Sequence, residues 1–332
     1  MDSFVEFMIR PRRVCYSTLQ LGLPKFTING VTYIRKDLQI QNDYGLTLRC
    51  SHFLRERGSK MPCIVYCHGN SGSRLDCLDI LEHLLPLNIS ILAFDFSGSG
   101  QSDGDYVSMG HYEKDDIKIV VQYLERLGTS HIGLWGRSMG AVSALLYSSY
   151  FRNVDFVIAE SPFASLRTLC VELVNTHTKI PKILAQLLVS RLRSGVKKTA
   201  KFDIDDVELI GRIHKVKCPV LLLHSNEDEL IPITHAQALM SKAKGNVSFI
   251  ETCGSHNCQR SPENINKIVS FLTENIEEKP YEEECTEDIM PSIHCTNSFS
   301  LRNLNLRKDT ERKNNAGQYF KLAQKALKKE EK

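Results

Sequence analysis

The sequence predicts an α/β fold in which helices cover both faces of a mostly parallel central sheet. Short runs of strand length alternate with segments of helical periodicity between residues 31 and 275. The central runs, such as 63–67, 89–94 and 218–224, are almost wholly apolar, which is typical of strands buried on both faces of a parallel sheet. Because strands alternate with helices, successive strands can form βαβ units, and such units build a parallel sheet.

The first strands are expected to pair differently from the rest. The segments 31–41 and 46–53 flank the turn-rich residues 42–45 (Asn-Asp-Tyr-Gly), which predicts an antiparallel hairpin. Alternating elements then follow in chain order: a strand over 63–67, a helix over 75–85, a strand over 89–94, a helix over about 112–127 and a strand over 132–135.

A long interval without a clear strand separates the strand over 154–159 from the strand over 218–224. It is long for a plain connection, and its middle is helical and basic. We therefore expect a short helical cap over about 162–215, and a pair of ordinary crossover helices is the alternative. The core is expected to close with a helix over 234–244, a strand over 247–251 and a helix over 262–275.

This pattern predicts one main domain over residues 30–277. An N-terminal segment, 1–29, precedes it, and a tail over 278–332 with blocks of like charge is expected to be disordered. The net charge of +3 is too small to suggest a nucleic-acid partner. The 11 cysteines show neither C-x-x-C pairs nor metal-ligand spacing, so we expect reduced thiols and no metal.

The location of the protein is predicted from its N-terminus and its apolar runs. No run is long enough for a membrane-spanning helix. In residues 1–13 the acidic side chains come before the basic ones, the reverse of a secretory signal, and Asp2 excludes N-myristoylation. We therefore expect a cytoplasmic protein. The apolar and basic residues of this segment, with Cys15, leave a weak peripheral membrane contact open, but packing on its own domain is favoured because stable anchoring needs two signals.

One short motif predicts chemistry. The sequence Gly136-Arg-Ser-Met-Gly140 fits the pattern G-x-S-x-G and lies between an apolar strand and a helix rich in small residues. This strand–turn–helix context is that of a nucleophile elbow, which holds the serine, here Ser138, in a strained conformation with its hydroxyl exposed. An ordinary strand-to-helix turn with an inert serine is the alternative.

Two further candidates follow later strands. Asp228 comes just after the strand over 218–224, and His256 comes after the strand over 247–251. The carboxyl ends of parallel strands meet at one edge of a sheet, so we expect both side chains near Ser138. An imidazole would accept the serine proton, and a carboxylate would fix the tautomer of that imidazole.

These assignments have alternatives. His256 could be a surface histidine, and Asp228 could belong to a solvated cluster with its acidic neighbours Glu227 and Glu229. Glu160, which follows the strand over 154–159, is the reserve acid.

Two backbone N–H groups are expected to form an oxyanion hole. One belongs to Met139, at the N-terminus of the helix that follows Ser138. The other is expected from the loop over 68–72, where Asn70 is the candidate, although this loop differs from the HGGG loop of lipases. His68 is interpreted as a residue that positions this loop.

The motif segments 68–72, 95–104, 136–140, 228–232 and 254–256 resemble those of small intracellular α/β-hydrolases related to palmitoyl-protein thioesterases. They are also similar to serine aminopeptidase-like hydrolases of the prolyl-oligopeptidase group. The resemblance covers roughly residues 30–275. It implies an α/β-hydrolase fold and a serine hydrolase without a cofactor.

We therefore predict a serine hydrolase that cleaves an ester or thioester through an acyl-enzyme intermediate. The substrate is expected to be a small molecule or an acylated protein or peptide. A serine peptidase or aminopeptidase is the first alternative, in which Glu160 is the candidate to hold the amine of the substrate. A non-catalytic binding or scaffold protein that acts through its charged tail is the second alternative. The oligomeric state is not predicted.

Overall fold

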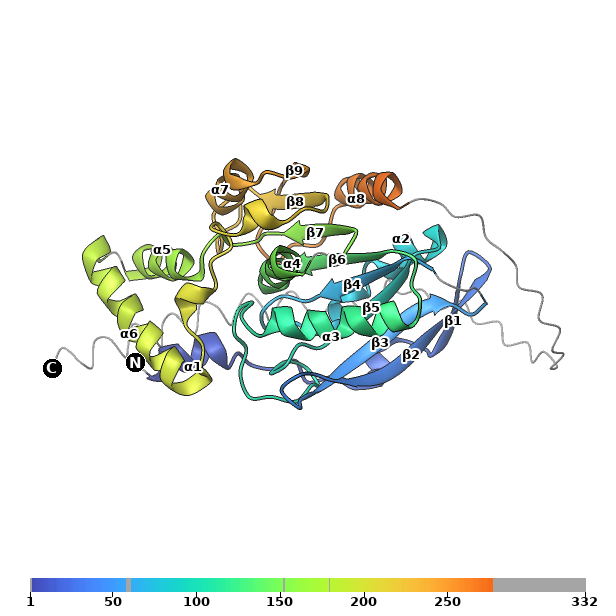
Figure 1. Ribbon diagram of the computed structural model, residues 1–332, viewed down its shortest axis with the longest axis horizontal. Coiled ribbons are helices and arrows are strands. Elements are labelled where there is room, and N and C mark those ends of the chain that lie inside the picture. The colour runs from blue at the N-terminus through green and yellow to red at the C-terminus, as the bar shows by residue number, and fades with distance from the viewer. Residues whose placement is uncertain (1, 58–60, 152, 179, 277–332) are drawn as a thin grey trace.

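A computed structural model describes residues 2–57, 61–151, 153–178 and 180–276. They form a nine-stranded sheet in the order β1-β2-β3-β5-β4-β6-β7-β8-β9, in which the strands from β5 to β9 run parallel to one another (Figure 1). The strands are β1 (Lys25–Ile28), β2 (Val31–Gln41), β3 (Thr47–Arg55), β4 (Cys63–Cys67), β5 (Ser90–Phe94), β6 (Ile132–Arg137), β7 (Phe156–Glu160), β8 (Val220–Ser225) and β9 (Val247–Thr252). The predicted fold class is confirmed.

Helices cover both faces of the sheet, and each face has its own apolar core. The helices are α1 (Asp2–Ile9), α2 (Leu81–Leu84), α3 (Glu113–Arg126), α4 (Met139–Tyr150), α5 (Leu166–Thr178), α6 (Lys182–Ala200), α7 (Thr234–Lys242) and α8 (Pro262–Asn275). Side chains of α3 and α4 pack in one core, and those of α2 and α8 pack in the other. The central strands are buried throughout because they are covered from both sides.

The antiparallel part of the sheet is larger than the sequence analysis expects. The predicted hairpin is present as β2 and β3, but β1 adds a further antiparallel strand within the segment placed before the domain. Asn29 and Gly30 connect β1 to β2, with φ values of 50° and 79°. Asn-Gly is the typical two-residue hairpin loop because both residues tolerate positive φ. This dipeptide therefore specifies a hairpin that the strand pattern alone does not predict.

The helix predicted over 75–85 is not continuous. Tight turns over Arg74–Cys77 and Leu85–Leu87 flank the single turn of α2. Ser73 accepts a hydrogen bond from the N–H of Leu75 and so starts the first turn. The apolar periodicity correctly marks the buried face of this segment, but burial of that face does not require one unbroken helix.

The segment expected as a cap contains α5 and α6, which extend at the end of the molecule toward which β7 points (Figure 1). α1 packs against α6, and its Val5 and Ile9 are buried. The described part of the N-terminal segment thus packs on its own domain. Among the described residues, no helix has the length and apolarity needed to cross a bilayer. The predicted tail, 278–332, lies outside the described residues.

Candidate active site

Ser138 occupies the sharp turn between β6 and α4. Its φ of 53° and ψ of −120° are strained for a residue with a side chain. The backbone holds it there, because its N–H donates to the carbonyl of Glu160 at 2.8 Å and its carbonyl accepts from Val142 at 3.1 Å. The strand–turn–helix geometry of a nucleophile elbow is therefore present around this serine.

Close backbone packing under the elbow requires glycine at position 140. A Cβ built on Gly140 would overlap the carbonyl of Cys67, which belongs to β4 and cannot rotate away. We expect Gly140→Ala to lower the free energy of unfolding by about 3 kcal/mol, measured by urea denaturation. Gly211→Ala is the matched control, because its Cβ would meet only the flexible end of Glu208. Equal stability of the two variants would contradict this account.

The structure brings the three predicted residues together. The Nε2 atom of His256 lies 3.1 Å from the Oγ atom of Ser138. The Nδ1 atom of the same ring lies 2.7 Å from the Oδ2 atom of Asp228. All three side chains are buried, so water competes little for these contacts.

Asp228 is arranged to remain ionised. Its Oδ1 atom accepts hydrogen bonds from the N–H groups of Ile231 at 2.8 Å and Leu230 at 3.0 Å. Burial raises the pKa of Asp228, but the hydrogen bond and charge of His256 and these two N–H groups outweigh burial, so the pKa lies below its ordinary value. An ionised Asp228 accepts from Nδ1–H, which leaves Nε2 free to accept the proton of Ser138.

The backbone of the loop that carries His256 is held by three side chains, which we call the His-loop clamp. Glu227 accepts from the N–H of Gly254 at 2.7 Å, and Glu229 accepts from the N–H of His256 at 3.1 Å. Arg137 donates to the carbonyl groups of His256 and Cys258, at 2.8 Å each. The acidic neighbours of Asp228 thus have specific partners, and the sequence analysis assigned none of these three side chains to the site.

Both predicted oxyanion donors belong to segments next to Ser138. Met139 begins α4, and Asn70 follows Gly69, whose Cβ, if built, would lie 3.6 Å from the Cβ of Ser138. Among the described residues, no protein acceptor is paired with the N–H of Met139 or that of Asn70. His68 positions this loop: its Nε2 atom accepts from the N–H of Phe96 at 3.0 Å, so its Nδ1–H donates to the carbonyl of Gly69 at 2.8 Å.

Glu160, the reserve acid, has other partners. Its carboxylate accepts from the indole N–H of Trp135 and from Arg260, at 2.8 Å for Arg260. Burial raises the pKa of Glu160, but the charges of Arg260 and Arg137 outweigh burial and lower it overall. The structure therefore pairs Asp228, and not Glu160, with His256. A lone sequence could not reveal the Arg260 partner, which lies 100 residues away along the chain.

Two buried histidines near the site were not predicted. His224 donates from Nε2 to the carbonyl of Ile231 at 2.8 Å, and the same atom is 3.6 Å from Oδ2 of Asp228. His235 accepts from the N–H of Ala164 and donates to Glu172 of α5, so it ties α7 to the cap segment. Each lies within a strand or helix, where sequence offers no signal that separates it from an ordinary core residue.

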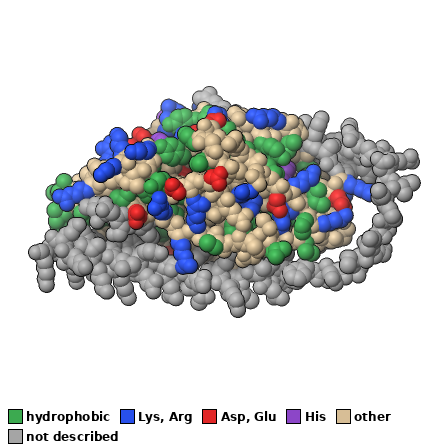
Figure 2. Space-filling view, turned by 90° about the horizontal axis from the view of Figure 1, so that it is seen from below, with side chains coloured by type: hydrophobic (Ala, Val, Ile, Leu, Met, Phe, Trp, Pro, Cys, Tyr) green, Lys and Arg blue, Asp and Glu red, His purple; other side chains and the backbone are tan. Residues whose placement is uncertain are grey.

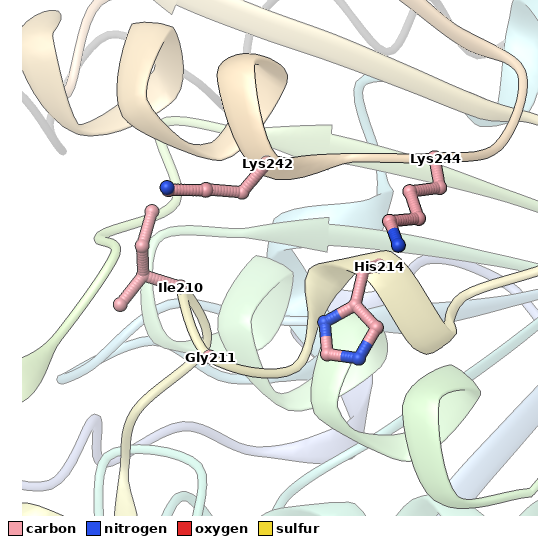
Figure 3. Close-up of a pocket in the computed structure, with 5 residues that line it drawn as sticks. All are labelled: Ile210, Gly211, His214, Lys242 and Lys244. Carbon is pink, nitrogen blue, oxygen red and sulfur yellow. The ribbon is translucent and has the colours of Figure 1, made fainter.

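A surface pocket of about 430 Å³ lies apart from these residues. Figure 3 shows Lys242, Lys244 and His214 around it, together with Ile210 and Gly211. Both lysines are exposed, and none of the predicted site residues lines the pocket. In the described part of the chain, no group of three His, Cys, Asp or Glu side chains could hold a metal ion.

Comparisons with known proteins agree with this architecture. Residues 62–187 match the family model described as the alpha/beta hydrolase fold. The uncharacterized protein YqkD of Bacillus subtilis is 33% identical over 203 residues, which cover 58% of this chain and 64% of YqkD. The lysophosphatidylserine lipase ABHD12 of Danio rerio is 27% identical over 56% of this chain and 48% of the lipase. The matches thus span less than two thirds of the length of either relative.

A solved structure shows the same fold. The esterase PF2001 of Pyrococcus furiosus superposes with a TM-score of 0.61 and 22% identity, over 81% of this chain and 97% of the esterase. In this chain that fold comprises the mostly parallel sheet, its covering helices and the strand–turn–helix at Ser138. The chain therefore has the α/β-hydrolase fold.

Proposed function

We propose that the protein is a serine hydrolase that cleaves an ester or thioester bond. The observation that carries this proposal is the continuous line of hydrogen bonds from Asp228 through His256 to Ser138, which is held in a strained turn. A serine hydroxyl is a poor nucleophile until a neighbouring base accepts its proton, and this line provides that base. A protein that only binds a partner has no need to maintain such strain.

The proposed reaction has two stages. Ser138 attacks the carbonyl carbon while His256 takes its proton, and the N–H groups of Met139 and Asn70 stabilise the oxyanion. The tetrahedral intermediate collapses, His256 gives its proton to the departing alcohol or thiol, and an acyl-serine remains. Water then attacks with His256 as base, which releases the carboxylic acid and restores Ser138.

An ester or thioester is preferred to a peptide for two reasons. An aminopeptidase needs a free carboxylate for the amine of its substrate, and the candidate, Glu160, is already paired with Arg260 and Trp135. The name of the ABHD12 relative also describes a lipase, which is an esterase. We propose a small molecule or an acylated protein as the substrate, and the predicted cytoplasmic location remains part of this proposal.

Labelling with a fluorophosphonate probe tests the proposal. The probe phosphonylates only an activated serine, so we expect the purified protein to be labelled and to hydrolyse p-nitrophenyl esters or acyl thioesters faster than aminoacyl amides. Faster cleavage of the amides would favour the peptidase alternative. A folded protein that is not labelled would favour the non-catalytic alternative.

The His-loop clamp gives a second test. Arg137→Met removes both hydrogen bonds to the loop but keeps the length of the side chain. Because a shift of about 1 Å in a catalytic base can reduce the rate about 10²-fold, we expect kcat to fall by about that factor while KM changes little. The measurement is steady-state ester hydrolysis.

Arg126→Met, which changes an exposed arginine at the end of α3, is the matched control. Arg137→Lys keeps a donor and is expected to recover part of the lost rate. If kcat of Arg137→Met stays within about twofold of the wild type, this assignment of Arg137 is wrong.

A further inference from the structure

The helix α6 presents large aliphatic side chains outward. Ile183 is 73% exposed, Leu184 is 49% exposed and Leu187 is 58% exposed. These three lie within one and a half turns of the helix. The opposite face of α6 is buried in the core. It consists of Ala185, Val189, Leu192, Val196 and Ala200. Packing of the core therefore does not explain why aliphatic residues occupy the exposed positions of α6.

The rest of the exposed face of α6 carries basic and neutral polar side chains. Ile183, Leu187, Arg191, Ser194 and Lys198 follow one another at spacings of three or four residues, so they form one stripe along the helix. The stripe is apolar over its first two turns and basic beyond them. The 19 residues of α6 include five Lys or Arg and no Asp or Glu, and Arg193 and Lys197 pair with Asp203.

The stripe lies on the outer side of the molecule. α6 lies at the left end of Figure 1, beyond α5. Figure 2 shows hydrophobic and basic side chains together at that end. An aliphatic group flanked by basic residues matches a surface with an apolar interior and negative headgroups.

We propose that the exposed stripe of α6 docks on a lipid surface that contains anionic headgroups. The aliphatic side chains would enter the acyl region, and Arg191 and Lys198 would lie at the headgroups. One weak membrane-binding signal gives only marginal binding to a bilayer. This stripe combines two such signals, the aliphatic side chains and the basic side chains. A second copy of the chain fits less well, because it would bring like charges together and three side chains are too few for a stable protein interface.

Docking in this way would place the candidate site near the lipid. α5 begins shortly after β7 ends, and Glu172 of α5 accepts a hydrogen bond from His235 of α7, so the cap segment is tied to the core close to the carboxyl edge of the sheet. Ser138, Asp228 and His256 lie at that same edge. The docking proposal does not depend on catalysis, since it concerns a separate surface.

Sedimentation of the 332-residue chain with vesicles tests the proposal. The probes are vesicles of phosphatidylcholine alone and vesicles in which phosphatidylserine replaces part of the phosphatidylcholine. We expect binding to the second kind, weakened by salt. Ile183→Gln with Leu187→Gln should lower the partition coefficient about tenfold or more, and Arg191→Gln with Lys198→Gln should remove the preference for phosphatidylserine.

Leu19→Gln with Leu23→Gln is the matched control, because these leucines are also strongly exposed, at 85% and 58%, but lie outside α6. This control and Ser138→Ala should bind as the wild type does, so loss of catalysis and loss of docking are distinguishable. The proposal is overturned if the wild type does not bind phosphatidylserine vesicles, or if the Ile183 and Leu187 changes leave binding unaltered. Light scattering that shows self-association through the stripe, without vesicle binding, would also overturn it.

Discussion

Ser138→Ala is expected to abolish fluorophosphonate labelling and to lower kcat for ester hydrolysis by about 10⁴-fold or more. The substitution removes the only atom that can form the acyl bond, the Oγ atom that lies 3.1 Å from Nε2 of His256. The fold should survive, because the strained turn is held by backbone hydrogen bonds that alanine can also make. Gel fluorescence and steady-state kinetics measure the two effects.

Ser161→Ala is a demanding control for this experiment. Ser161 follows β7, the strand next to β6, is also largely buried, and has a φ of 49°, close to that of Ser138. Among the described residues, no imidazole is hydrogen-bonded to its hydroxyl, and its backbone N–H donates to the carbonyl of Leu223. We expect Ser161→Ala to keep its labelling. Equal labelling of Ser138→Ala and the wild type would refute the assignment of Ser138 as nucleophile.

Asp228→Asn is expected to lower kcat by about 10⁴-fold. The amide keeps the shape of the carboxylate, but it can present an N–H to Nδ1 of His256 and so favour the tautomer whose Nε2 carries a proton. That tautomer cannot accept a proton from Ser138. Because the pKa of Asp228 lies below its ordinary value, the carboxylate is ionised throughout the neutral range, and the deficit should persist from about pH 6 to pH 9.

Asp228 is also expected to make the free energy of unfolding depend on pH. A lowered pKa in the folded state means that Asp228 stabilises the fold above the unfolded pKa of about 3.9 and that this contribution is lost as pH falls through the folded pKa. The difference in unfolding free energy between the wild type and Asp228→Asn should therefore shrink below about pH 4. Urea denaturation at several pH values measures it.

Glu229→Gln is the matched control for Asp228→Asn. It also removes one negative charge beside the site, but its amide oxygen can still accept from the N–H of His256. We expect its kcat to fall less than about tenfold. If both variants lose activity equally, a general loss of negative charge, and not the tautomer of His256, would explain the effect.

Local sequence was sufficient to predict the structures that a few neighbouring residues specify. Fully apolar strands predicted the buried parallel sheet, and Gly136, Ser138 and Gly140 predicted the strained turn, because the neighbouring strand and helix leave little choice of backbone. The same reasoning applied to Asn29 and Gly30 would have found the first hairpin.

Long-range contacts decided which partners the charged residues around the site have. Glu160 pairs with Arg260, whereas Glu227 and Glu229 hold the loop of His256. These partners come from distant parts of the chain, so the local sequence does not specify them. The segment over 75–85, predicted as one helix, forms separate short turns. Apolar periodicity identifies the buried face of such a segment, but it does not specify whether the helix is continuous.

The sequence by itself determined the layered α/β architecture and the three side chains that meet at one edge of the sheet. Both follow from hydrophobic periodicity and from the position of each residue at the end of a strand. Only the tertiary structure decided the partners of each charged group and the outward face of α6. The physical reason is that burial and electrostatic pairing depend on groups distant in the chain, which a local pattern does not specify.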